Sequence, residues 1–107
     1  MLYKFKSKAT GDLIMTAPVG DRLLRLVGHE PTPQGIFLPE SLPAAIAALE
    51  KAIAAEEQER RDADAEAAAE GRPPLRREGV SLRQRAWPLV EMMKRAQAAD
   101  KDIVWGV

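Results

Sequence analysis

The stretch Ser81-Leu-Arg-Gln-Arg-Ala-Trp-Pro-Leu-Val-Glu-Met-Met93 carries the strongest folding signal in this sequence. Its apolar residues recur with a period of about 3.6 residues, which predicts an amphipathic helix with one buried face. The residues of that face are Leu82, Ala86, Leu89, Val90 and Met93. Ser81 and Gln84 form a capping box at the start of the helix. Pro88 cannot donate a backbone hydrogen bond, so the helix either bends there or starts again.

A longer helix is predicted before this stretch, and only its first part has a buried face. Four apolar residues at helical spacing form that face: Leu42, Ile46, Leu49 and Ile53. Ser41 is the expected N-cap, with Pro43 in the first turn. No large apolar residue lies between Ala54 and Pro74, where the composition is mainly that of strong helix formers. We therefore expect a solvated helical rod that frays before Gly71, or a mobile linker.

Charge is balanced over the whole chain but is segregated along it. The formal net charge is +0. Residues 56–70 carry seven carboxylates against two arginines, and residues 72–85 carry five arginines against one glutamate. Within the acidic block, Glu56–Arg60 and Glu57–Arg61 are favourably ordered helical pairs. The two blocks either neutralise each other or provide a patch for a partner.

Both ends of the chain have the pattern of β-strands. Apolar and lysine residues alternate from Tyr3 to Lys8, which predicts a half-buried strand. A turn at Ala9–Asp12 and a short apolar run at Leu13–Met15 complete an antiparallel hairpin. Ile103–Trp105 is a short β-prone run that suits pairing with this hairpin.

A first helix is expected between the hairpin and the long helix. Apolar residues at helical spacing place it at about 17–27, after a Thr16 cap and before a Gly28 stop, with Gly20 as a weak point. Gly35–Leu38 is a short apolar run that fits either a strand or a buried crossover.

These elements predict an α+β fold in one domain. The N-terminal hairpin and the C-terminal strand pack against three helices, and the second helix is extended and solvated. The domain spans residues 1–107, with a charged helical or flexible segment at about 56–79.

Composition narrows the class of protein. The chain has 107 residues and no cysteine, which excludes disulfides, thiolate metal sites and a cysteine nucleophile. The first residues do not have the pattern of a signal peptide. No apolar run approaches the roughly 20 residues of a membrane helix. We therefore expect a cytoplasmic protein that does not interact with a membrane.

The residues give no positive support for an enzyme. His29 beside Glu30 would supply at most half of a tetrahedral metal site, and it is better explained as a surface histidine at a helix end. The three serines lie in no nucleophile-elbow motif, and there is no phosphate-binding glycine motif. We predict no catalytic residue, no cofactor and no metal.

The candidate interaction surface combines basic and aromatic side chains. Its members are Arg76, Arg77, Arg83, Arg85, Trp87 and Trp105. One hypothesis is a protein-interaction module whose partner is another protein or a second copy. The alternative is a nucleic-acid-associated protein that uses the arginines at 72–85, although pairing of these arginines with the acidic block is a simpler explanation. Both tryptophans suit core packing. Trp105 lies nearer the terminus, and it is the one we expect in an interface.

Several segments together resemble a known family. They are Met1-Leu-Tyr-Lys-Phe-Lys-Ser, Gly20-Asp-Arg-Leu-Leu-Arg, Pro43-Ala-Ala-Ile, Val80-Ser-Leu-Arg-Gln-Arg-Ala-Trp-Pro-Leu-Val and Val104-Trp-Gly-Val. The chain resembles, over essentially its whole length, the small bacterial family catalogued as domain of unknown function 1840. The resemblance implies a short, stand-alone bacterial protein, and it brings no activity and no catalytic residues.

Overall fold

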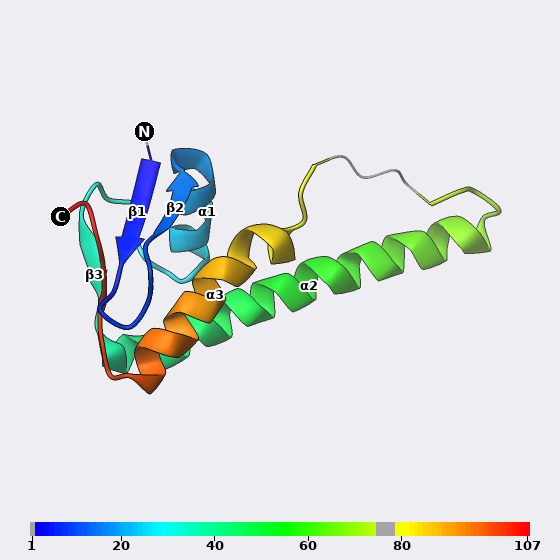
Figure 1. Ribbon diagram of the computed structural model, residues 1–107. Helices are drawn as coiled ribbons and strands as arrows, with labels where there is room; N and C mark the ends of the chain where they lie inside the picture. The colour runs from blue at the N-terminus through cyan, green and yellow to red at the C-terminus, as the bar shows by residue number, and fades with distance from the viewer. Residues whose placement is uncertain (1, 75–78) are drawn as a thin grey trace.

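A computed structural model describes residues 2–74 and 79–107 (Figure 1). This part of the chain forms a four-stranded antiparallel sheet, three α-helices and one 3-10 helix. The elements in chain order are β1 (Leu2–Lys6), β2 (Leu13–Thr16), α1 (Ala17–Leu26), β3 (Gly35–Phe37), η1 (Pro39–Ser41), α2 (Leu42–Ala69), α3 (Leu82–Ala98) and β4 (Ile103–Trp105). The predicted α+β fold is confirmed, including the long second helix.

The sheet has the strand order β2-β1-β4-β3. Phe5 lies opposite Leu13 on one side and opposite Trp105 on the other, so the hairpin and the C-terminal strand pair as expected. Gly35–Phe37 forms a strand against β4, which decides between the two interpretations of this run. β2 and β3 are therefore the two edges of the sheet.

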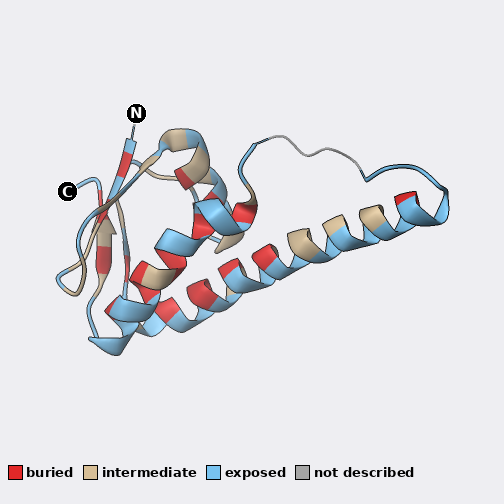
Figure 2. Cartoon of the chain, turned by 45° about the vertical axis from the view of Figure 1, so that its right-hand side comes forward, coloured by how far each residue is buried: buried red, intermediate tan, exposed pale blue. Residues whose placement is uncertain are grey.

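The core lies between one face of the sheet and the helices. Phe5, Ile103 and Trp105 contribute fully buried side chains from the strands. All residues of the two predicted helical faces are buried: Leu42, Ile46, Leu49 and Ile53 on α2, and Leu82, Ala86, Leu89, Val90 and Met93 on α3. Figure 2 shows the buried positions of α2 running along one side of that helix. Both spacing predictions are therefore confirmed.

α2 continues well beyond the core. We call residues 54–69 the arm, because Ile53 is the last residue of α2 in the hydrophobic core. The arm is helical to Ala69, so of the two expectations for this segment the helix is correct. The described part of the molecule is elongated, with extents of 52 × 29 × 22 Å, and the arm forms its long projection (Figure 1). Ala67, near the tip, is buried outside the main core, and the backbone N–H of Arg72 donates to its carbonyl.

The observed helix ends agree in part with the caps and stops predicted from the sequence. The capping box of Ser81 and Gln84 is present, and Gly28 has a positive φ of 80° just after α1. α3 is one helix with Pro88 inside it, so it does not start again there. Thr16 and Ser41 occupy N-cap positions, but neither side chain makes a capping hydrogen bond. Ser41 is already in a helical conformation because η1 leads directly into α2.

Gly20 is a packing requirement and not a weak point. It is buried in α1 against the ring of Tyr3, where an added Cβ would lie 2.1 Å from the ring carbon Cδ2. Tyr3 in turn donates a hydrogen bond from its hydroxyl to Asp21. A side chain at position 20 would therefore separate α1 from β1.

The expectation that Trp105 lies in an interface is wrong. Its side chain is completely buried, with the indole between Phe5, Phe37 and His29. Its Nε1 donates a 3.0 Å hydrogen bond to the backbone carbonyl of Thr32, so the polar atom is satisfied inside the fold. The physical reason is that β4 is an interior strand, and position 105 faces the helices.

Candidate interaction surfaces

Trp87 is the exposed tryptophan of this protein. Its side chain is 37% exposed on the surface of α3. The guanidinium of Arg83 lies 5.3 Å from the ring centroid, and the Lys94 ammonium lies 5.2 Å from it. Both distances are within the range of a cation–π contact. Trp87 is therefore the centre of a positively charged cluster and not a core residue.

Salt bridges hold that cluster against α2. Arg83 donates from Nε and Nη2 to the two carboxylate oxygens of Glu57, each at 2.9 Å. Lys94 lies 3.8 Å from Glu50. The hydrogen bond from Arg83 lowers the pKa of Glu57, and the same bond raises the pKa of Arg83. Arg83 is therefore committed to a partner within the chain, as the simpler explanation of the charge pattern predicted.

The acidic block makes contacts that the helical spacing only partly predicted. Glu56 pairs with Arg60 at 3.1 Å, as expected, and also accepts a hydrogen bond from the backbone N–H of Leu82. Glu57 and Arg61 form no direct salt bridge, because Glu57 binds Arg83 while Arg61 donates to Gln58. The charge of Arg61 still contributes to the lowered pKa of Glu57. The start of α3 is thus fixed against the first turns of the arm.

The remaining predicted site residues are separated from this cluster. Arg85 lies on another side of α3, beside β2, and it has no ion-pair partner among the described residues. Arg76 and Arg77 lie outside the described residues. Arg72 pairs with Glu70. The predicted arginine–tryptophan surface is therefore not one continuous patch in the described part of the chain.

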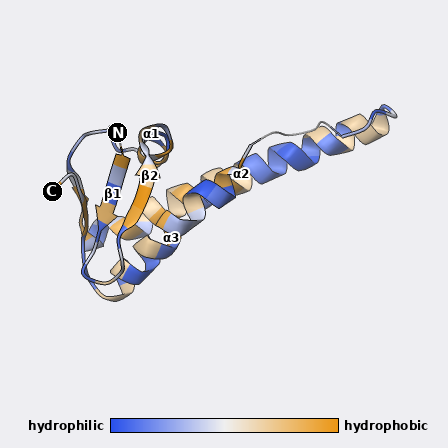
Figure 3. Ribbon diagram, turned by 45° about the horizontal axis from the view of Figure 1, so that its top comes forward, coloured by the Kyte–Doolittle hydropathy of each residue, from blue (hydrophilic) through white to orange (hydrophobic). Residues whose placement is uncertain are grey.

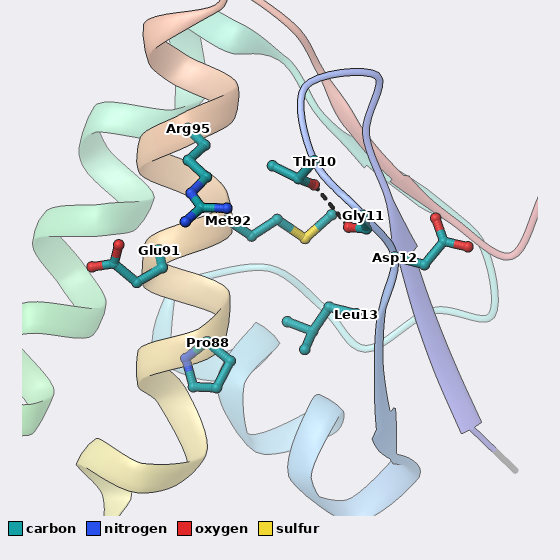
Figure 4. Close-up of a pocket in the computed structure, with 8 residues that line it drawn as sticks. All are labelled: Thr10, Gly11, Asp12, Leu13, Pro88, Glu91, Met92 and Arg95. Carbon is teal, nitrogen blue, oxygen red and sulfur yellow. Dashed lines mark hydrogen bonds between the residues drawn. The ribbon is translucent and has the colours of Figure 1, made fainter.

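A groove follows the outer edge of β2 and separates it from α3. Its first part is a hollow of about 240 Å³. The residues around it are Thr10, Gly11, Asp12, Leu13, Pro88, Glu91, Met92 and Arg95. In Figure 4 the side chains of Met92 and Leu13 lie between the helix and the hairpin, with Arg95 and Glu91 above Pro88 on the helix. Asp12 is paired with Lys4 at 3.6 Å.

The second part of the groove is a hollow of about 310 Å³ that shares Leu13 and Pro88 with the first. Its lining consists of Leu13, Ile14, Met15, Thr16, Val19, Val80, Gln84, Arg85 and Pro88. Arg85 is the charged residue of this lining. All four residues of β2 line this hollow. Alternate side chains of a strand point to opposite faces of the sheet, so a hollow on one face would be lined by only every second residue. The hollow must therefore run along the edge of the sheet.

Apart from Arg85, the residues of this groove could not be found from the sequence. Arg95 and the hairpin turn carried no motif, and the edge position of β2 follows from long-range strand order. The position of Pro88 is informative in retrospect. Since proline has no N–H, the carbonyl of Gln84 receives no helical hydrogen bond from it, and both residues line the groove.

The described residues contain no arrangement typical of a metal centre. No group of three or more histidine, cysteine, aspartate or glutamate side chains in residues 2–74 and 79–107 could hold a metal ion. His29 packs edge-on against Phe37 and Trp105, and its Nδ1 lies 2.8 Å from the carbonyl of Glu30. Its position next to the C-terminal end of α1 agrees with the sequence-based interpretation. Within the same ranges, no helix is long and apolar enough to cross a membrane.

Comparison with known proteins places the chain in a family. The family described as "Domain of unknown function (DUF1840)" matches residues 1–105. The chain belongs to this family, and the resemblance seen in the sequence is confirmed. No curated protein and no solved structure matches the chain.

Proposed function

We propose that this protein is an interaction module that binds an extended segment of another protein along the edge of β2. The observation that carries the proposal is the groove between β2 and α3, whose larger hollow is lined by all four residues of the strand. In this proposal the interaction site is the groove and not the Trp87 cluster, and no residue has a catalytic role.

The edge of a sheet is suited to this mode of binding. Every second residue of an edge strand directs its N–H and C=O groups away from the sheet, and an added strand can pair with them. β2 pairs only with β1 among the described residues. Gln84 lines the α3 side of the groove, and its carbonyl lacks the helical hydrogen bond that Pro88 cannot donate.

The lining indicates the chemistry of the bound segment. Leu13, Met15 and Val19 offer apolar contacts on one side, and Val80 is 48% exposed at the far end. Arg85 adds a positive charge with no ion-pair partner in residues 2–74 and 79–107, so a carboxylate on the segment would find a partner. We therefore propose a segment in which apolar and acidic residues alternate.

A nucleic acid is the alternative partner. Arg85 and Arg95 could contact phosphates, and this stays a proposal. It has less support, because Arg72 and Arg83 are paired with carboxylates and the arm carries negative charge that would repel a polyanion.

The test uses a fluorescein-labelled peptide of about ten residues in which valine and glutamate alternate, a length sufficient to extend beyond both ends of β2. We expect saturable binding by fluorescence anisotropy. Hydrogen–deuterium exchange at residues 13–16 should slow in the complex, because their outward N–H groups become bonded. A peptide with proline at the valine positions should bind far less, since proline removes the donors.

Two variants provide the matched comparison. Arg85→Glu should weaken peptide binding, whereas Lys51→Glu, an exposed charge reversal on α2, should leave it unchanged. Equal binding by both variants, or unchanged exchange at residues 13–16, would show that the groove is not the site. Tight binding of a labelled single-stranded RNA with a steep salt dependence would favour the nucleic-acid alternative.

A further inference from the structure

The face of the sheet opposite the helices is uncovered and has an unusual composition. Ile14 lies opposite Lys4, and Lys6 and Ile36 both lie opposite Val104, so these side chains share one face. Ile14 is 56% exposed and Ile36 44%. The solvent face of an antiparallel sheet is normally polar. Here apolar residues alternate with lysines, which is typical of a surface that receives a partner.

Lysines outnumber carboxylates in the main hollow of this face, where two lysines lie with one aspartate. Lys6 and Lys8 line a hollow of about 240 Å³ with Ser7, Asp102 and Val104. Neither lysine has an ion-pair partner among the described residues, whereas Lys4 is paired with Asp12. A partner that carries carboxylates is therefore complementary to this face.

The arm of the same protein carries a matching stripe. Glu59, Asp62 and Glu66 are all exposed, and their spacing of three and four residues puts them on one side of α2. We call these three residues the acidic stripe. Ala55 and Ala69 extend it at the same spacing, so small side chains flank the carboxylates. Figure 3 shows the hydrophilic residues concentrated along the middle of the arm.

The acidic stripe faces away from the rest of the molecule. Glu57, on the other side of the arm, binds Arg83 of the body. The arm also leads away from the sheet (Figure 1), and α2 begins on the helix-covered side of it. A rigid helix in this position cannot bring its stripe to the open face of its own sheet.

We propose that the open sheet face of one copy receives the acidic stripe of a second copy. The arm is about 24 Å long at 1.5 Å per residue, and a four-stranded sheet is about 19 Å wide at 4.8 Å per strand, so one arm can cross the whole face. The alanines allow close approach to Ile14, Val104 and Ile36. The carboxylates then lie beside Lys6 and Lys8, and the sheet becomes covered by helices on both sides.

The proposed contact joins two different surfaces, so it is head-to-tail. Each dimer still has one open face and one unused arm, and the assembly grows into longer chains unless a ring closes. This contact shares only Ile14 with the lining of the β2 groove. It does not depend on the function proposed for that groove.

Sedimentation velocity over a range of protein concentrations tests the proposal. We expect the average mass to rise with concentration, and to rise less at about 1 M ionic strength than at about 0.01 M, where the Debye length is roughly 30 Å. Lys6→Glu/Lys8→Glu and Glu59→Lys/Glu66→Lys should each weaken association by about tenfold or more, because two attractive charge pairs become repulsive.

Mixing the two variants is the decisive measurement. The reversed face meets the reversed stripe, and the unchanged face meets the unchanged stripe, so association should return in the mixture. Glu30→Lys/Glu40→Lys is the matched control, which makes the same charge change off the arm and should leave association intact. If the charge reversals disturb folding, the milder variants Lys6→Gln/Lys8→Gln and Glu59→Gln/Glu66→Gln replace them. Each of these variants should also weaken association.

Three results would overturn the proposal. The first is a monomer at every concentration and salt. The second is an association that neither variant weakens. The third is a mixture of the two variants that remains as monomeric as each variant alone.

Discussion

Arg83 on α3 donates two parallel hydrogen bonds, each 2.9 Å long, to the two carboxylate oxygens of Glu57 on α2. Two-point contacts of this kind combine charge with a fixed geometry. The pair lies where the arm leaves the core, beside the backbone N–H of Leu82, which is bound by Glu56. It therefore fixes the start of α3 on the long helix.

This pair predicts an acid-dependent contribution to stability. The folded-state pKa of Glu57 lies below its usual value of 4.5, because Arg83 stabilises the charged form. The contribution is thus complete above the unfolded pKa and is lost as the pH falls through the folded pKa. Urea denaturation of the wild type and Arg83→Gln should differ at pH 7 and converge in acid. A pH-independent difference would show that the pair contributes through packing alone.

Tyr3 gives a prediction at alkaline pH, and it is the only tyrosine in the sequence. Burial, together with the hydrogen bond to Asp21, raises its pKa to about 12. Ultraviolet titration of the phenolate should show this value in the folded protein and about 10 after unfolding. Because the folded pKa is the higher one, stability should fall as the pH rises between these values. Tyr3→Phe should remove that dependence.

Gly35 should not tolerate a side chain. A Cβ there would lie 2.1 Å from the Cζ2 atom of Trp105, which is completely buried. Gly35→Ala should therefore cost about 1–3 kcal/mol through overpacking, or more if β3 is displaced. Gly11→Ala is the matched control, since no atom lies within 4 Å of its added Cβ. Thermal unfolding of both variants measures the difference, and equal midpoints would mean that β3 is not packed on Trp105.

Substitution of Leu89 by alanine should cost more stability than substitution of the larger Trp87. Leu89 is 1% exposed in the core, so Leu89→Ala should cost about 2–5 kcal/mol. Trp87→Ala removes a larger side chain but one that is 37% exposed between two cations. Its loss of stability should be clearly smaller. Urea denaturation of the two variants decides the order, and a reversal would place Trp87 in the core.

The arm should contribute little to the folding of the body. Deletion of residues 60–70 removes no residue of the main core, since Ile53 is the last core position on α2. The shortened helix would end close to the start of α3, which is already bound by Glu56. We expect a loss below about 2 kcal/mol in urea denaturation. A larger loss would mean that the arm and the segment after it are packed together.

The sequence by itself determined the elements of this fold except β3, which it left open, and η1. The helical spacing in Leu82–Met93 and Leu42–Ile53, the capping box at Ser81 and the alternation from Tyr3 to Lys8 all act between residues two to four positions apart. The backbone period alone fixes which of these side chains share a face. For this reason the buried faces of α2 and α3 could be predicted residue by residue.

Only the tertiary structure decided which surfaces are available. The order β2-β1-β4-β3 makes β4 an interior strand, which buries Trp105 and leaves the edge of β2 open. Arg83 and Arg85 are two positions apart in the sequence, yet one is paired with Glu57 and the other lines the groove. The partner of Arg83, Glu57, is 26 residues away in the sequence. The carbonyl that binds Trp105, that of Thr32, is 73 residues away. Contacts over such separations form when the sheet and helices pack, and local spacing does not determine them.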